Sequence, residues 1–145
     1  MGQKVHPIGF RVGVYRPWDS IWFAKKDFAD LVLEDRKIRD FIKKDPDFKG
    51  AGIAGVDIKR AAQKLTIKIH TSRPGMVIGQ KGKKIEDLRR RLERMLGRDL
   101  IIDVQEVRKP EINAQLVAEN IALQLERRVS FRRAMKKAVG QAQKF

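Results

Sequence analysis

The residues of this chain best suited to chemistry form a glycine-containing segment, VIGQKGKKI, at positions 77–85. Gly79 and Gly82 lack side chains, so a sugar-phosphate backbone can approach the main chain closely. Amide N–H groups at the start of a following helix would point toward the phosphates, and the helix dipole favours their negative charge. Three lysines in and just after the loop add Coulomb attraction. The predicted RNA-binding residues of this loop are Gly79, Gln80, Lys81, Gly82, Lys83 and Lys84.

A Gly-x-x-Gly loop that clamps about four nucleotides of backbone is the signature of the KH module. Here the loop has a fuller frame, with Val77 and Ile78 before it and Ile85 returning to the core after it. We expect Val77, Ile78 and a sheet edge to form an apolar floor for bases. The Gly-x-x-x-x-Gly-Lys-Ser/Thr frame of a nucleotide P-loop is absent. A tight helix–helix turn without a ligand is the alternative.

Apolar periodicity around the loop predicts the elements that position it. Leu65, Ile67 and Ile69 alternate with polar residues, which is typical of a strand with one buried face. The expected elements are a helix from residue 27 that ends by Pro46, strands over 53–60 and 64–70, a short helix from Pro74, a helix over 83–96, a strand over 100–107, a helix over 113–129 and a second basic segment over 131–139. This order predicts an α+β fold, in which helices cover one face of a three-stranded sheet as in the type II KH domain.

The helical spacing also predicts core faces and a division of the chain into parts. The expected core faces are Ile85, Leu88, Leu92, Met95 and Leu96 in one helix and Ala114, Val117, Ala118, Ile121 and Leu125 in a later one. Glycines, prolines and aromatics without clear periodicity at the start indicate an arm. The expected parts are an extended arm over 1–22, a KH domain over 23–110 and a helical segment over 111–145, which would begin a truncated C-terminal domain.

Charge is large and clustered. The chain has 33 Lys+Arg against 18 Asp+Glu, a net charge of +15, which favours polyanionic partners. Residues 127–145 carry seven basic residues and no acid. The RNA-binding residues predicted here are Arg127, Arg128, Arg132, Arg133, Lys136 and Lys137, and in the arm Lys4, His6 and Arg11. A membrane-surface helix over 127–145 is the alternative, which the small number of large apolar residues disfavours.

Other features exclude several function classes. The chain has no cysteine and two histidines, so we expect neither metal nor cofactor. The Glu34/Asp35 and Asp45/Asp47 pairs lie in charged stretches and are predicted to be exposed, which leaves no acid–base site and no enzyme. No apolar run approaches the length of a membrane span, so a cytoplasmic protein without a small-molecule substrate is expected.

Some residues have two interpretations. The arginines of the helix over 83–96 and Arg98 either grip RNA or form a solvated, ion-paired face. Trp18, Trp22 and Phe23 are expected to pack the arm on the domain, with base stacking as the alternative. His70, at a strand end, is predicted to be exposed or hydrogen-bonded, not catalytic.

Three motifs carry a family resemblance. They are MGQKVHPIGFRVGV at 1–14, TSRPGMVIGQKGKKIEDL at 71–88 and EVRKPEINAQLVAENIALQLERRVSFRRAMKKAV at 106–139. Together they resemble the bacterial type of the universal small-subunit ribosomal protein three. Other KH proteins share only the middle motif, so the two outer motifs are the specific ones.

The resemblance implies partners: small-subunit ribosomal RNA in the subunit head, messenger RNA where it enters, and neighbouring small-subunit proteins. It also implies that Arg132, Arg133 and Lys136 face the mRNA and assist its unwinding. Family members continue into a strand-rich C-terminal domain, whereas this chain stops at Phe145. A free-standing KH regulator or a ribosome assembly factor remains the alternative function. A nucleotide hydrolase would need a phosphate loop and a carboxylate for its metal, neither of which the sequence offers.

Overall fold

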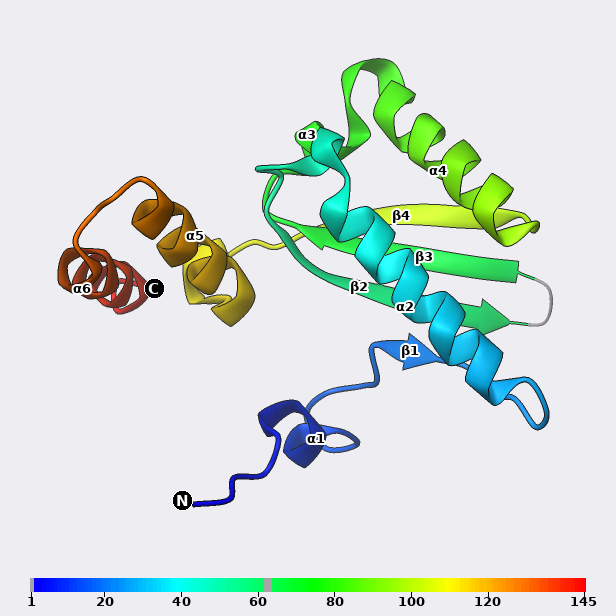
Figure 1. The fold of residues 1–145 in the computed structure, drawn as a ribbon, viewed down its shortest axis with the longest axis horizontal. Helices are drawn as coiled ribbons and strands as arrows, with labels where there is room; N and C mark the ends of the chain where they lie inside the picture. The colour runs from blue at the N-terminus through cyan, green and yellow to red at the C-terminus, as the bar shows by residue number, and fades with distance from the viewer. Residues whose placement is uncertain (1, 62–63) are drawn as a thin grey trace.

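The computed structural model describes residues 2–61 and 64–145, and its core is one sheet with helices on one face (Figure 1). The strands are β1 (Ser20–Ile21), β2 (Ile53–Ala61), β3 (Lys64–Thr71) and β4 (Leu100–Glu106), in that spatial order. The β2/β3 pair is antiparallel, and β1 and β4 add to its two sides in parallel. The α+β class with a KH arrangement is therefore confirmed.

The strand with the clearest alternation behaves as predicted. Leu65, Ile67 and Ile69 of β3 are buried, at most 2% exposed, while the residues between them face the half-solvated side of the sheet. A period of two places every second side chain on the same face, so local sequence determines this register.

The helical layer consists of α2 (Phe28–Lys44), the short α3 (Pro74–Ile78) and α4 (Lys83–Leu96). Ile38 and Ile42 of α2 and Leu88 and Leu92 of α4 belong to one hydrophobic core, and all four side chains are fully buried. Met95 was predicted to face the core but is 42% exposed, because it lines an open groove between α2 and α4.

The arm differs from the extended segment predicted from sequence. Residues Pro7–Arg11 form a short helix, α1, because proline fits the first helical turn and the Nδ1 of His6 accepts a hydrogen bond from the backbone N of Gly9 at 3.2 Å. The two-residue β1 then adds a fourth strand to a sheet predicted to have three. No local pattern marks so short a strand, whose partner β2 lies more than thirty residues away in the chain.

The C-terminal helices are α5 (Ala114–Glu126) and α6 (Phe131–Ala142), which Figure 1 shows beyond the end of the sheet. The Oδ1 of Asn113 caps α5 as predicted, accepting from the N–H of Gln115 and of Leu116. The helix predicted to reach residue 129 ends at Glu126, because Arg128 adopts a left-handed conformation with φ of 60°. Short one-turn helices η1 (Pro46–Phe48), η2 (Gln80–Gly82) and η3 (Pro110–Ile112) complete the fold.

The predicted core face of α5 is wrong in part. Ala114, Ala118 and Leu125 are exposed, and the one buried side chain of α5 is Leu116. The cause is tertiary, since α5 contacts the KH domain near Gly52 and Ser72 through Leu116, one position before the predicted Val117. Across the described ranges, 2–61 and 64–145, no helix has both the length and the apolar character needed to cross a membrane.

Candidate nucleic-acid interface

The glycine loop links α3 to α4 through a reversal that needs positive φ at three of its positions. Gly79 has φ of 71°, Lys81 has φ of 51° and Gly82 has φ of 78°. Glycine adopts this region at no steric cost, whereas Lys81 is a non-glycine residue whose backbone is held in the left-handed region. Gly82 is the N-cap of α4 and carries no capping side chain, so no side chain competes with an anion for the N–H groups that follow Lys83. The N–H of Lys83 itself donates to the backbone oxygen of Gln80.

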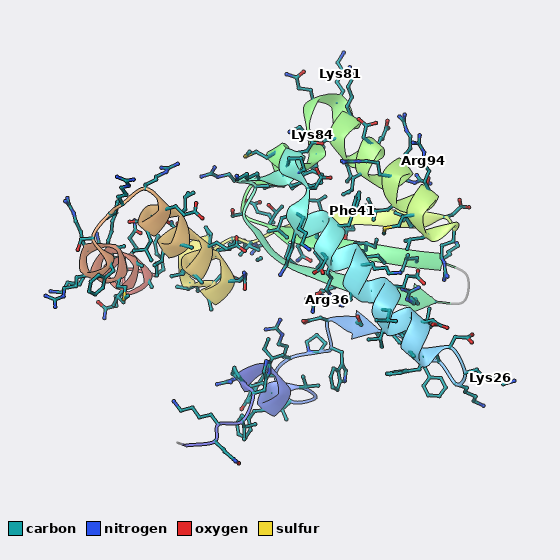
Figure 2. All side chains as sticks on the ribbon, viewed as in Figure 1. Lys26, Arg36, Phe41, Lys81, Lys84 and Arg94 are labelled. Atoms are coloured by element: carbon teal, nitrogen blue, oxygen red, sulfur yellow. The ribbon has the colours of Figure 1, made fainter. Side chains whose placement is uncertain are left out.

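The three lysines of the loop differ in what their side chains contact. A Cβ at Gly79 would lie 2.7 Å from the Cγ of Lys84, so the Lys84 side chain runs directly over this glycine. The ammonium of Lys84 donates to the backbone oxygen of Asp47 at 3.3 Å, which ties it to η1. Lys81 and Lys83 are exposed, and Figure 2 shows Lys81 at the far tip of the helical layer. These two cations, with Gln80 between the glycines, are the best placed to meet a phosphate.

The apolar floor differs from the predicted one. Val77 is fully buried and belongs to the core, so it cannot contact a base. Ile78 is 39% exposed, and Ile101 on the outer strand β4 is 54% exposed. The exposed apolar side chain beside the loop is thus Ile78, because Ile101 pairs with Thr66 near the start of β3, whereas the loop follows the other end of that strand. Helical phase explains this, because neighbouring residues of the short α3 point in different directions.

The arginines of α4 are mostly engaged in ion pairs. Arg89 lies 2.7 Å from Glu93, and this hydrogen bond raises the pKa of Arg89 above its ordinary value. Arg90 contacts Glu86 and Asp87, Arg91 contacts Asp45 and Asp47, and Arg98 contacts Glu34. Within the described residues only Arg94 of this set has no ion pair. The structure therefore favours the ion-paired interpretation of this helix over a phosphate grip.

The acidic pairs that were predicted to be exposed are partly buried. Asp35 is 2% exposed and Asp45 is 6% exposed. Asp35 contacts Arg60, and Asp45 lies 2.7 Å from Arg91. Sequence reasoning missed these contacts because both arginines come from elements distant in the chain, and burial of a carboxylate requires such a partner. Both carboxylates serve structural ion pairs.

The basic residues after α5 divide between a turn and a helix. Arg127 and Arg128 lie in the turn, whereas Arg132, Arg133, Lys136 and Lys137 lie on α6. All six are exposed, and no ion pair involves any of them among the residues that the structure describes. The guanidinium of Arg132 lies 5.7 Å from the ring centre of Phe131, a cation–π distance.

The three candidate arm residues are exposed, but two of them already serve the arm's own structure. His6 caps α1, and Arg11 donates to the backbone oxygen of Pro7 at 2.9 Å. The loop, α6 and the arm lie at separate places on the molecule (Figure 1). The fold therefore does not bring the predicted residues into one site.

The structure also places the aromatic residues of the arm and His70. Trp22 is half-buried and its Nε1 donates to Asp35, whereas Trp18 and Phe23 are 68% and 83% exposed. Packing of the arm on the domain is thus confirmed for Trp22 and wrong for the other two. His70 hydrogen-bonds Asp57 at 2.8 Å, as the hydrogen-bonding interpretation predicted.

One cluster was missed altogether from sequence. A cleft of about 860 Å³ separates the KH domain from α5 and α6, and its lining includes Lys43, Lys49, Arg73 and Arg127. These cations come from four separate segments of the chain, so no motif or spacing could have grouped them. Only the tertiary arrangement brings them to one hollow.

Comparisons with known proteins agree with the loop geometry. The family model of the KH domain matches residues 37–112. The small ribosomal subunit protein uS3 of Syntrophobacter fumaroxidans is 63% identical over 145 residues, which is 100% of this chain and 69% of that protein. The protein of the same name from Geotalea uraniireducens is 55% identical over 100% of this chain and 68% of its own length. The chain therefore belongs to the uS3 family of small ribosomal subunit proteins, a structural and non-enzymatic family with a KH RNA-binding domain.

Proposed function

We propose that the chain binds ribosomal RNA in the head of the cytoplasmic small subunit, beside neighbouring subunit proteins, and that α6 lines the place where mRNA enters. The observation that carries this proposal is the concentration of six exposed basic side chains in residues 127–137, where no acid is present. An acid-free surface of this kind attracts the phosphates of RNA and has no internal partner to satisfy it.

The charges of α6 share one side of the helix. At 100° per residue, Arg132, Lys136, Arg133 and Lys137 fall within an arc of about 140°. Ala134 lies outside that arc and is fully buried, because it packs the helix against the rest of the C-terminal segment. The helix thus buries one face and presents a basic stripe on the other, which suits contact with the backbone of a passing strand.

The glycine loop supports a separate contact to ribosomal RNA. It offers a start of α4 that no side chain caps, two exposed lysines and the partly exposed apolar side chain of Ile78. This combination clamps a sugar-phosphate backbone and leaves the bases against an apolar surface. Since the loop and α6 lie apart, two RNA segments can be held at once (Figure 1).

The mRNA role is tested by ribosomes that carry Arg132→Ala, Arg133→Ala and Lys136→Ala. We expect slower translation through an mRNA hairpin and an unchanged rate on an unstructured message, because the helix acts on the strand entering the subunit. In a matched control, three other exposed lysines are replaced with alanine. They are Lys25 and Lys26 at the arm junction and Lys37 of α2. Equal rates on the hairpin for variant and control would overturn the mRNA role.

The ribosomal placement is tested by sedimentation of the tagged chain. Co-migration with small subunits that persists at raised salt supports assembly into the subunit. A salt-labile free pool would instead favour a free-standing KH regulator or assembly factor, because such proteins bind RNA transiently.

A further inference from the structure

The cleft between the KH domain and the α5–α6 pair, here called the interdomain cleft, is a hollow whose lining includes neither the glycine loop nor the four basic residues of α6. Its volume is about 860 Å³. Its KH side is formed by the end of α2, the segment after η1 and the turn after β3, and its other side by α5 and the end of α6. The charged groups that line it are Lys43, Lys49, Arg73, Arg127, Glu111 and Glu119.

The cations of the interdomain cleft lack acidic partners. Lys43, Lys49, Arg73 and Arg127 are exposed and form no ion pair within the part of the chain that the structure describes. Arg73 makes one long hydrogen bond, 3.5 Å, to the backbone oxygen of Gly50, so most of its donors stay free. Like charges that converge on one hollow repel each other unless an anion lies between them.

The acids of the interdomain cleft do not cancel these cations. The carboxylate of Glu119 accepts a hydrogen bond from the Nε2 of Gln115 at 2.8 Å, along α5. Glu111 is half-buried in η3. With two acids against four cations, the lining keeps a net positive charge. The amides of Asn120, Gln124 and Gln141 add neutral donors and acceptors that suit sugar hydroxyls and base edges.

Few protein contacts cross the interdomain cleft. Leu116 is the one buried side chain of α5, and it seats against Gly52 and Ser72. Gly52 has φ of 65°, and a Cβ there would lie 2.3 Å from the Oγ of Ser72 and 3.5 Å from the Cδ2 of Leu116, so these two side chains close the floor over this glycine. Beyond this contact the chain joins the two sides through the segment that follows β4 (Figure 1).

We propose that the interdomain cleft binds the sugar-phosphate backbone of an RNA strand and that the bound strand fixes the α5–α6 pair against the KH domain. The phosphates would lie between two walls, with Lys43, Lys49 and Arg73 on one side and Arg127 on the other. Repulsion among these four cations is then replaced by attraction of each cation to the phosphates. This inference rests on the proposed function only in that the chain binds RNA. It adds a third contact surface and gives that contact an orienting role.

The first test compares two variants from which the same number of positive charges is removed. The cleft variant carries Lys43→Gln, Lys49→Gln, Arg73→Gln and Arg127→Gln, and its control carries Lys25→Gln, Lys26→Gln, Lys37→Gln and Arg94→Gln on exposed surface elsewhere. The probe is an oligouridylate of about twelve nucleotides. For each phosphate that a variant no longer neutralises, the log–log slope of affinity against salt should fall by about 0.7, and it should fall further in the cleft variant than in the control. Equal slopes overturn the proposal.

The second test measures how the α5–α6 pair is oriented relative to the KH domain. The chain has no cysteine, so Lys59→Cys on β2 and Ala122→Cys on α5 give a clean pair for fluorescent labels. We expect oligouridylate to narrow the distance distribution in the otherwise unchanged chain and in the control, but not in the cleft variant. RNA binding that leaves the distribution equally broad in all three overturns the orienting role.

A third arm separates this inference from the loop proposal. In a chain that carries Gln80→Asp and Lys81→Asp, the cleft substitutions should still lower the salt slope, because none of residues 79–84 lines the cleft. If the loop change alone is silent while the cleft change is not, the loop role fails and the cleft stands. If the cleft change is silent in both backgrounds, the cleft proposal fails alone.

Discussion

The indole Nε1 of Trp22 donates a 2.7 Å hydrogen bond to the Oδ2 of Asp35, and this contact joins the arm to the KH domain. The same oxygen accepts from the hydroxyl of Ser20 at 2.7 Å, and the other carboxylate oxygen pairs with Arg60. A buried carboxylate is stable only with such partners. Asp35 thus holds the end of the arm beside the sheet, together with Arg39, which donates to the hydroxyl of Ser20 and to the backbone oxygen of Asp19.

Replacing Asp35 with alanine should lower the free energy of unfolding by about 3 kcal/mol, because Arg60 is then left without its most buried partner. Glu34 also pairs with Arg60 at 3.2 Å, which limits the destabilisation. Urea unfolding followed by circular dichroism measures the change. The control is Asp30→Ala, an exposed acid on the same helix, and an equal effect of both would show that the Asp35 network adds nothing.

Gly79→Ala should distort the glycine loop, because the position has φ of 71° and the new Cβ would meet the Lys84 side chain at 2.7 Å. We expect stability to fall by about 1 to 3 kcal/mol, together with weaker binding of single-stranded RNA. Gly75→Ala in α3 is the matched control, since a Cβ there meets nothing within 4 Å. Thermal unfolding and an RNA titration of both variants check this, and wild-type behaviour of Gly79→Ala would contradict it.

Arg128→Gly should stabilise the chain without RNA by about 1 kcal/mol, because glycine adopts φ of 60° without steric cost. Removal of the cation should weaken RNA binding in the same variant. Arg127→Gly serves as control. Arginine adopts the φ of −80° at this position without strain, so glycine there only adds backbone flexibility. The melting temperatures in the absence of RNA should move in opposite directions, and a fall in both would contradict the strain argument.

Leu116→Ala should loosen α5 from the KH domain at a cost of about 2 kcal/mol, because the side chain is 8% exposed and closes the floor of the interdomain cleft. Hydrogen exchange should accelerate in α5 and α6 but not in β3. The control is Leu125→Ala, whose side chain is 42% exposed on the same helix. Faster exchange throughout the sheet would mean that α5 is an integral part of the core.

The amphipathic patterns of the sequence were reliable where burial follows local periodicity. The strand over residues 64–70, the helix over 83–96 and the Asn113 cap are all found at their predicted places. The amide cap and the alternation of β3 depend on residues within a few positions of each other, so neighbouring sequence contains all the information they need. Gly79 and Gly82 were recognisable for the same reason.

By itself, then, the sequence determined the α+β elements, the glycine loop and the basic stretch near the C-terminus, because each follows from short-range spacing or composition. Only the tertiary structure decided that Asp35 and Asp45 are buried, that residues 20–21 add a strand, and that Leu116 rather than Val117 anchors α5. It also decided which cations are free, since Arg91 meets Asp45 and Lys84 meets the Asp47 oxygen across the fold. The physical reason is that a charge's environment depends on partners from distant segments, and no local pattern contains them.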